Sequence, residues 1–599
     1  MRMRVADYIA GYLVKMGGRN VFMLSGGMMM HLIDAVGRMP AMKYYCNHHE
    51  QASAIAADVY ARCSAQLGVC YATSGPGATN IVTGLVGAWL ESSPVIFLTG
   101  QSKLSQTIRG SGLNGLRQFG TFEVDIVPIV ESVTKYAVFL NDPKSVRYHL
   151  EKAVRLALGG RPGPVLLDIP LDIQAATINP DKQLGCEDEL EPTPVASDEN
   201  IISVIEEFQS AKRPLIMCGY GVRVANAVAE FRNLARRLNC PVAITQLAKD
   251  CLTYDDPLFV GHPGVRGDRA GNFSVQNADM ILIIGTSLNA QTTGYETELF
   301  APHARKIHVD MDKAILHRGE NMVSFSIYSE VKAFIERLSQ ALDRRRTLWD
   351  WDTWRKQCMK WKCHYSVIKE PHRLGGDNDL LNYYEFVNVL SEMLCGDETI
   401  VADAGSSFYV MGQGFKLKDS QRFISSGALG SMGFSLPASL GAAVARPEQA
   451  IICVTGDGSL QTNVHELQTI RHYNLNIKAF IILNDGYVSI RNTQDSYFDG
   501  FRVGSSQESG VSLPCLEDLA NAYRLPYIDC PNRSQLKAAI RRTLSIPGPV
   551  ICGIHAQRDQ VIMPGVGSIR LPNGMMQSKS LQEMQPLLSD TELRSNMYW

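Results

Sequence analysis

Short apolar runs bounded by glycine or proline recur along the chain, and longer amphipathic stretches lie between them. Such runs are typical of buried parallel strands, and the stretches between them are typical of helices. The first residues differ, because Val5, Ile9, Leu13 and Met16 recur at helical spacing. This spacing predicts an opening helix of the first domain and not a cleaved signal peptide.

The strand-like runs fall into three blocks. The first block holds GVCYAT (68–73), PVIFLTG (94–100) and PVLLDIP (164–170); the second holds RPLIMCGYG, CPVAITQ, ADMILIIG and KIHVDMD; the third holds TIVADAG, AIICVTG, IKAFIILN and GPVICGI. Polar linkers at 179–200 and 369–382 separate the blocks. The pattern predicts an α/β protein of three doubly wound domains on parallel sheets. We expect domains at 1–180, 195–345 and 375–556, and a tail at 557–599 that packs over another domain or subunit.

Composition narrows the class of protein. A chain of 599 residues with 45% hydrophobic and 20% charged residues is too long for one core but ordinary for a globular protein. Its net charge of -2 gives no reason to expect nucleic acid or an anionic membrane as partner. No apolar run reaches the roughly 18 residues that span a bilayer. The 14 cysteines form no CxxC pair, so we expect free thiols in the cytoplasm and no cysteine-bound metal.

Two strand-like runs of the third block end in polar residues, at the strand ends where open α/β sheets bind ligands. Gly456-Asp457-Gly458-Ser459 follows IICVT, and Asn484-Asp485-Gly486 follows KAFIIL. A carboxylate of Asp457, an amide oxygen of Asn484 and the carbonyl of Gly486 would be three hard oxygen ligands. They suit Mg²⁺, which leaves its other positions to phosphate oxygens and water. The alternative is a pair of ordinary turns, because Asp-Gly and Asn-Asp-Gly turns are common.

The spacing favours the metal site. GDG followed by Asn, 27 residues from Asp457 to Asn484, resembles the diphosphate–Mg²⁺ motif of thiamine diphosphate enzymes. VFMLSGGMMMHLIDAV, NHHEQASAIAADVYAR, ATSGPGATNIVTGLVGAWLESSPVIFLTGQ and SSGALGSMGFSLPASLGAAVA are similar to segments of the acetolactate synthase-like branch of that superfamily. The resemblance spans about residues 1–560. It implies pyrimidine-binding, central and diphosphate-binding domains, in that order.

The resemblance also implies roles for particular residues. Glu50 is at the position of the family's catalytic glutamate, which hydrogen-bonds the aminopyrimidine ring of the cofactor and promotes the tautomer that activates it. A surface glutamate is the alternative for a lone Glu. Met432 is where the family places a bulky apolar residue beneath the cofactor, although a core methionine is the default. The implied cofactor contacts are Gly26, Gly27, Glu50, Gly405, Ser406, Ser407, Met432, Gly456, Asp457, Gly458, Ser459, Asn484, Gly486, Tyr487 and Val488.

Other positions depart from the family pattern. Phe122, in LRQFGTFEVDIVPI, stands where the synthases carry a glutamine that faces the substrate, and Gln118 is a possible substitute. Thr493 stands at the position of a tryptophan that selects the acceptor, and Ile490 would line the same pocket. The synthases bind FAD through an arginine-containing stretch, but GTSLNAQTTG (285–294) has no arginine, so we expect FAD to be absent.

The resemblance implies a transferase or lyase. The first hypothesis is a carboligase that decarboxylates a 2-oxo acid, pyruvate above all, and joins the acyl carbanion to a carbonyl acceptor. The second is a decarboxylase or C–C lyase without ligation. A non-catalytic protein of this fold is less favoured, because Glu50, Asp457 and Asn484 are all present. The resemblance further implies a homodimer or homotetramer with active sites at subunit interfaces.

Overall fold

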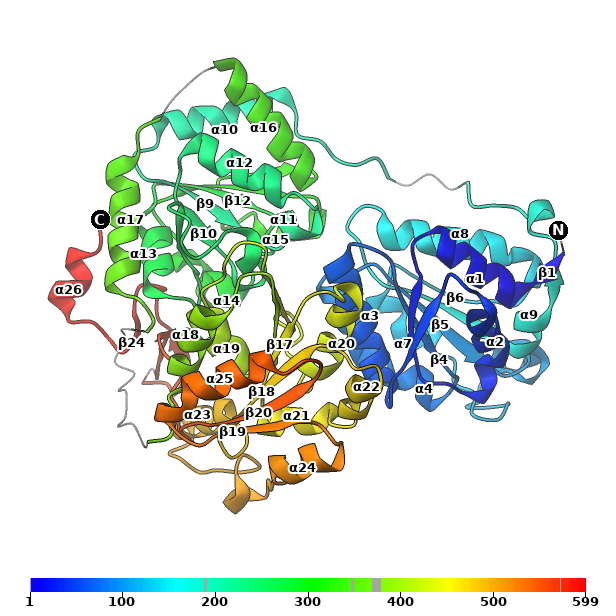
Figure 1. Ribbon diagram of the computed structural model, residues 1–599. Coiled ribbons are helices and arrows are strands. Elements are labelled where there is room, and N and C mark those ends of the chain that lie inside the picture. Colours follow the sequence, from blue (N-terminus) through cyan, green and yellow to red (C-terminus); the bar gives the residue numbers. More distant parts are fainter. Residues whose placement is uncertain (1, 188–190, 346–348, 369–378, 571, 599) are drawn as a thin grey trace.

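The chain is described by a computed structural model that covers residues 2–187, 191–345, 349–368, 379–570 and 572–598. Three six-stranded sheets, all parallel, form the centres of three lobes (Figure 1). The predicted class of three α/β domains on parallel sheets is thereby confirmed. The domain boundaries themselves stay predictions, and most of the expected linker at 369–382 lies outside the described residues.

The first sheet has the strand order β3-β2-β4-β5-β7-β6. Because the chain turns to opposite sides of β2, a crevice is expected beyond the carboxyl ends of β2 and β4. The strands are β2 (Asn20–Met23), β3 (Lys43–Cys46), β4 (Gly68–Ala72), β5 (Val95–Gln101), β6 (Tyr136–Phe139) and β7 (Val165–Pro170). The main helices are α1 (Val5–Lys15), α2 (Met30–Arg38), α3 (Glu50–Ser64), α4 (Pro76–Asn80), α5 (Val82–Leu90) and α8 (Val146–Leu158).

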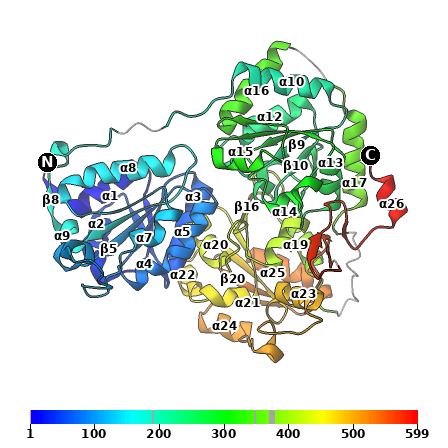
Figure 2. The same ribbon diagram turned by 180° about the vertical axis from the view of Figure 1, so that it is seen from behind.

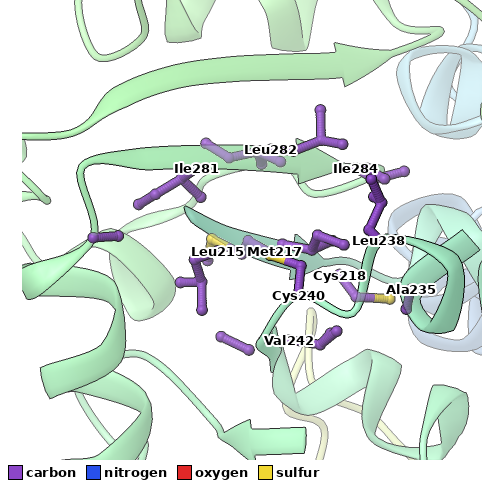
Figure 3. Packing of buried hydrophobic residues seen from close by; sticks show 14 of the residues in the cluster. Leu215, Met217, Cys218, Ala235, Leu238, Cys240, Val242, Ile281, Leu282 and Ile284 are labelled. Carbon is purple, nitrogen blue, oxygen red and sulfur yellow. The ribbon is translucent and has the colours of Figure 1, made fainter. Parts of the chain in front are cut away.

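The central sheet has the order β11-β10-β9-β12-β13-β14, and its switch point lies between β9 and β12. Leu215, Met217 and Leu282 on its strands pack with Leu238 from a covering helix (Figure 3). The strands are β9 (Pro214–Cys218), β10 (Val242–Ile244), β11 (Phe259–Gly261), β12 (Met280–Ile284), β13 (Arg305–Asp310) and β14 (Phe325–Tyr328). The main helices are α10 (Asp198–Ser210), α12 (Val228–Leu238), α13 (Arg269–Asn277), α16 (Val331–Arg345) and α17 (Asp352–His364).

The third sheet has the order β16-β15-β17-β18-β20-β19, with the switch point between β15 and β17. The strands are β15 (Thr399–Ala402), β16 (Arg422–Ser425), β17 (Ile451–Gly456), β18 (Ile477–Leu483), β19 (Tyr527–Cys530) and β20 (Val550–His555). The main helices are α18 (Tyr383–Met393), α19 (Ser406–Gly414), α20 (Ser435–Ala445), α21 (Asp457–Leu460), α22 (Glu466–His472), α23 (Val488–Tyr497), α24 (Leu516–Ala522) and α25 (Leu536–Ser545).

Helices α3 and α20 join the first and third domains (Figures 1 and 2). They approach so closely that a Cβ at Gly441 would lie 2.2 Å from the carbonyl oxygen of Ala56. Near the end of α3, the buried guanidinium of Arg62 donates to the hydroxyl of Tyr220 at 3.2 Å and to the carbonyl of Ser425 at 3.1 Å. One side chain of the first domain therefore contacts the other two domains.

The C-terminal tail returns to the central domain and lies beside α17 (Figures 1 and 2). It forms two short antiparallel pairs, β21 (Gly565–Val566) with β24 (Met584–Gln585) and β22 (Ser568–Arg570) with β23 (Met576–Ser578), and ends with α26 (Asp590–Ser595). Trp361 Nε1 donates to Asn596 Oδ1 at 2.7 Å, and the N–H of Tyr598 donates to Asn277 Oδ1 at 2.8 Å. Within the described ranges, no helix is both long and apolar enough to span a membrane.

Candidate active site

The carboxyl ends of β17 and β18 meet at the carboxylate of Asp457. Its two oxygens accept backbone N–H bonds from Gly458 at 2.7 Å, Asn484 at 2.9 Å, Asp485 at 2.8 Å and Gly486 at 3.3 Å. Asp485 and Gly486 have φ angles of 59° and 103°, in the left-handed region that non-glycine residues seldom adopt. The structure therefore brings the two predicted motifs together, with the carboxylate of Asp457 held by residues 484–486, which we call the 484–486 turn.

The electrostatics of this turn suit a cation. Burial raises the pKa of Asp457, although the four backbone N–H bonds oppose that shift. Asn484 Oδ1 is buried and accepts no hydrogen bond from the described residues, which is costly for a polar atom unless a ligand satisfies it. An oxygen donor without a partner beside a buried carboxylate fits Mg²⁺. The described residues contain no cluster of three His, Cys, Asp or Glu side chains for a metal, so amide and carbonyl oxygens would complete this site.

Glycines and a helix end shape the space around the turn. A Cβ at Gly458 would lie 2.5 Å from the ring of Tyr487, whereas a Cβ at Gly456 would face open space. Gly405 has a φ of 64°, which favours glycine, and precedes Ser406 and Ser407 in the first turn of α19. The free N–H groups of such a helix end attract phosphate oxygens. Gly405 faces Ser489 of α23, so α19 and α23 border the same space.

A buried carboxylate that the sequence analysis missed lies beneath this space. Asp403 accepts hydroxyl hydrogen bonds from Ser435 at 2.6 Å, Thr455 at 2.8 Å and Ser459 at 2.7 Å. Ser459 Oγ also accepts the N–H of Gly433 at 2.9 Å. The Ser459 hydroxyl, predicted as a cofactor contact, is thus hydrogen-bonded to two protein groups. Residue type alone gave no signal for Asp403, because its partners come from separate elements.

In the first domain, Glu50 is the first residue of α3 and is only 7% exposed. The Glu50 carboxylate accepts a hydrogen bond from Asn80 Nδ2 at 3.0 Å. A Cβ added at Gly77 would lie 3.2 Å from Oε1 of Glu50. Gly26 lies against Thr73, where an added Cβ would be 2.4 Å away, while a Cβ at Gly27 would face open space. Glu50, the 73–77 turn and Gly26 therefore lie together beyond the carboxyl ends of β2 and β4.

Phe122 lies against the 73–77 turn. Its carbonyl accepts Ser74 Oγ at 3.2 Å, and its φ of 59° is unusual for a bulky residue. The Phe122 side chain is 66% exposed. Gln118 Nε2 donates to the carbonyl of Glu123 at 3.1 Å, and its role as a substitute for the family glutamine stays a prediction.

Glu123 and Glu466 are two further residues that sequence reasoning missed. The buried carboxylate of Glu123 accepts N–H bonds from Ile108, Phe119 and Gly120 and so shapes the loop that carries Phe122. Glu466 of α22 is fully buried and accepts Asn47 Nδ2 and the N–H of His48, each at 2.9 Å. A side chain of the third domain therefore fixes the segment that leads into Glu50.

The residues predicted for the substrate pocket are exposed. Ile490 and Thr493 lie three residues apart on one face of α23, and Ile490 is 48% exposed. Met432, which was predicted to lie beneath the cofactor, is 39% exposed. The hydrogen bonds of the Glu50 side chain stay within the first domain and those of the Asp457 side chain within the third. Within the described part of the chain, no hydrogen bond therefore joins the Glu50 side chain to that of Asp457.

A cavity of about 320 Å³ lies where the three domains meet. Gly221, Thr286 and Asp310 line it, so it lies beyond the carboxyl ends of β9, β12 and β13, at the switch point of the central sheet. The arginine-free stretch 285–294 forms part of its wall. Arg161 and Arg266 also line the cavity. They belong to other segments of the chain, so the sequence of residues 285–294 gave no sign of them.

Comparison with known protein families identifies all three domains. Residues 3–119 match the N-terminal TPP binding domain of thiamine pyrophosphate enzymes, residues 201–338 their central domain and residues 403–554 their C-terminal TPP binding domain. Thiamine pyrophosphate is another name for thiamine diphosphate. The half-sites of Glu50 and Asp457 thus lie in or beside the two domains described as binding this cofactor.

Whole-chain relatives narrow the family further. An acetolactate synthase large subunit of Cyanidium caldarium is 33% identical over 558 residues, which cover 90% of this chain and 91% of the relative. The chain belongs to the acetolactate synthase family. Acetolactate synthase 1 of Zea mays is 30% identical over 94% of this chain and 87% of the relative. The large subunit of acetolactate synthase isozyme 1 of Escherichia coli is 28% identical over 94% and 95%.

Membership confirms the predicted resemblance and settles the class of activity. The chain is a thiamine-diphosphate-dependent enzyme of the acetolactate synthase type, a carboligase. The thiamine diphosphate prediction is confirmed with it. The ion, the flavin question, the assembly, the location in the cell and the role of each site residue stay predictions.

Proposed function

We propose that this acetolactate synthase family member decarboxylates pyruvate and joins the acyl carbanion to a carbonyl acceptor, with Mg²⁺ as the second cofactor. The observation that carries the proposal is the 484–486 turn, where the buried carboxylate of Asp457 and the unpartnered Oδ1 of Asn484 stand at adjacent strand ends. Asp457, Asn484 and the carbonyl of Gly486 would hold the ion. Gly405, Ser406 and Ser407 would receive the diphosphate at the start of α19.

When bound, thiamine diphosphate supplies the electron sink that makes decarboxylation of a 2-oxo acid possible. With the cofactor bound, the carboxyl group of Glu50 would donate a proton to the pyrimidine ring and take it back. Asn80 Nδ2 and the bulk of the 73–77 turn fix the direction of that carboxyl group. Because Glu50 is 7% exposed, few water molecules compete for the proton.

The acceptor is a carbonyl compound whose identity depends on the pocket of Phe122, Ile490 and Thr493. An apolar Phe122 in place of glutamine and a small Thr493 in place of tryptophan leave a wider, less polar site than the resemblance would otherwise imply. A broader acceptor range than that of a synthase follows. Release of an aldehyde without ligation is the competing activity, because a pocket that binds the acceptor poorly would leave the carbanion to be protonated.

The complete site requires two chains. Phe122, Met432 and Ile490 are 66%, 39% and 48% exposed in one chain, although large apolar residues around a reacting centre are usually shielded from water. A second copy that brings its Glu50 half-site to this Asp457 half-site would cover them. We therefore expect a homodimer, or a tetramer built from two dimers. We also expect a cytoplasmic enzyme.

The cavity between the domains could bind FAD. Its place at a switch point, with Gly221 and Asp310 in its wall, suits a nucleotide, and Arg161 and Arg266 supply the cations that 285–294 lacks. The expectation that FAD is absent therefore rests on that stretch alone. Absorbance of the purified protein in the visible flavin band decides the point.

Product analysis tests the proposed reaction. The full-length enzyme with Mg²⁺ and thiamine diphosphate is incubated with pyruvate, alone and with a series of aldehydes and 2-oxo acids, and products are identified by NMR and mass spectrometry. The expected products are carbon dioxide and a hydroxyketone formed from both substrates. Aldehyde as the sole organic product would favour the decarboxylase, and no release of carbon dioxide from any 2-oxo acid would refute the proposal.

A further inference from the structure

Arg491 is a buried cation that donates hydrogen bonds to backbone carbonyl groups. Its side chain is fully buried, and the carboxylate of Asp559 lies 3.4 Å from its Nε. Its Nη1 donates to the carbonyl oxygens of Asp485 at 2.7 Å and Ser505 at 2.9 Å. Its Nη2 donates to those of Asn484 at 2.7 Å and Arg558 at 2.5 Å. Four carbonyl groups from three separate segments therefore meet at one guanidinium.

The 484–486 turn lies between two opposite charges. Its N–H groups point to the carboxylate of Asp457, and the carbonyl groups of Asn484 and Asp485 point to Arg491. The peptide dipoles of the turn are thus aligned from a negative to a positive group, which is favourable in a buried site. This arrangement offsets the cost of the left-handed φ of 59° at Asp485.

Arg491 also connects the turn to its surroundings. The carbonyl oxygen of Ser505 accepts a hydrogen bond from the N–H of Tyr487 at 3.1 Å, so the loop at 505 packs against the residue that follows the turn. The next residue, Asn492, donates from Nδ2 to the carbonyl of Gln560 at 3.2 Å and accepts the N–H of Ile562. The start of α23, the loop at 505 and the first residues of the C-terminal tail are therefore held together around the proposed metal ligands.

We propose that Arg491 is the positioning residue that presets the 484–486 turn for the metal. The inference rests on the proposed Mg²⁺ role of Asp457, Asn484 and Gly486. Arg491 holds the carbonyl groups of Asn484 and Asp485 away from the ion, which leaves Asn484 Oδ1 and the carbonyl of Gly486 to face it. A guanidinium is needed because its planar fork reaches several oxygens at once, whereas a lysine ammonium cannot span them.

The test uses the full-length protein stripped of metal and titrated calorimetrically with Mg²⁺ in the presence of thiamine diphosphate. Arg491→Lys and Arg491→Met should weaken Mg²⁺ binding by about 10- to 100-fold, as loss of a supporting hydrogen bond does at other metal sites. The larger loss is expected for Arg491→Met. Arg305→Met is the control, because Arg305 pairs with Glu207 in the central domain and shares no partner with Arg491.

Hydrogen exchange of the wild-type enzyme gives a second readout that needs no variant. The amides of 484–486 should exchange slowly with and without Mg²⁺, because the turn is set before the ion binds. Wild-type Mg²⁺ affinity in the Arg491 variants, or amides protected only after Mg²⁺ is added, would overturn the inference. If the wild-type enzyme itself binds thiamine diphosphate without Mg²⁺, or Asp457→Ala retains it, the proposed function fails instead.

Discussion

At the scale of single residues, buried carboxylates shape this enzyme by accepting hydrogen bonds from N–H and O–H groups. Asp403 collects three hydroxyl groups, Asp457 collects four backbone N–H groups, and Glu123 collects three. Hydrogen bonds to a charged acceptor are stronger than neutral ones, so Asp457 and Glu123 each fix a loop that would otherwise have several conformations. Both loops carry proposed site residues, whereas Asp403 joins β17, α20 and α21.

Asp457→Ala should abolish the anchoring of thiamine diphosphate and Mg²⁺. The substitution removes the one anionic ligand and leaves four backbone N–H groups without an acceptor, so the 484–486 turn loses its shape as well as its charge. Calorimetry should give an affinity at least about 100-fold weaker than in the wild type. Asp518→Ala, at an exposed position of α24, is the control. Normal cofactor affinity in Asp457→Ala would mean that the metal site is elsewhere.

Glu50→Gln should bind the cofactor but lose activity. The amide keeps the size of the side chain but cannot protonate the pyrimidine ring, so turnover should fall by about 100-fold or more. Exchange of the C2 proton of thiamine diphosphate in deuterated water, followed by NMR, measures activation directly. Glu131→Gln, an exposed glutamate of the same domain, serves as the control. Exchange at the wild-type rate in Glu50→Gln would remove Glu50 from the mechanism.

At the scale of elements, all the interior strands but β2 were predicted and the edge strands were not. The apolar runs of the second and third blocks correspond to β9, β10, β12 and β13 and to β15, β17, β18 and β20, each of which has a neighbour on both sides. An interior strand of a parallel sheet is covered on both faces and is therefore almost continuously apolar. An edge strand such as β3, KYYC, is mostly exposed, and its pattern resembles that of a loop.

The candidate site was predictable only in part. Asp457 and Asn484 belong to local motifs, and Glu50 lies in a recognisable segment. Asp403, Glu123, Glu466 and Arg491 were not predicted, because their roles depend on partners from other elements, up to 419 positions away in the chain. A one-dimensional pattern contains no record of such a pairing. The structure was needed to find the residues that hold the predicted ones in place.

The loop of Phe122 offers a prediction at this scale. Glu123→Gln replaces a charged acceptor of three N–H groups by a neutral one, so the loop should open more often. Trypsin should then cleave after the exposed Arg117 about tenfold faster, with little change in the thermal midpoint; a factor of ten corresponds to about 1.4 kcal/mol, the scale of one such hydrogen bond. Glu131→Gln should match the wild type. An unchanged cleavage rate in Glu123→Gln would mean that other contacts hold the loop.

At the scale of the whole molecule, three domains with separate cores are joined by buried polar contacts. Arg62 contacts the other two domains, and Arg422 of the third domain donates to Asp250 of the central domain at 2.7 Å. These contacts set the relative positions of the domains within one chain. The Glu50 and Asp457 half-sites nevertheless remain separate, which makes assembly a condition of activity in the proposed function.

Mixing two inactive variants tests that condition. In a shared-site dimer, a pair of one Glu50→Gln chain and one Asp457→Ala chain has one site with both lesions and one with neither. Activity should therefore return after subunit exchange, to about a quarter of the wild-type value when random pairing makes half of the dimers mixed and one of the two sites in each is intact. Mass spectrometry measures the exchange. Complete exchange without any recovery of activity would rule out the shared site.

The tail has a consequence for the order in which the protein can be made. The central sheet is synthesised by residue 328, but Asn277 and Trp361 of this domain find their partners at Tyr598 and Asn596. Domains generally fold as they emerge from the ribosome, the N-terminal ones first. The central domain must therefore wait, with part of its surface uncovered, while more than two hundred further residues are translated. It is the middle domain in sequence and the last to be completed.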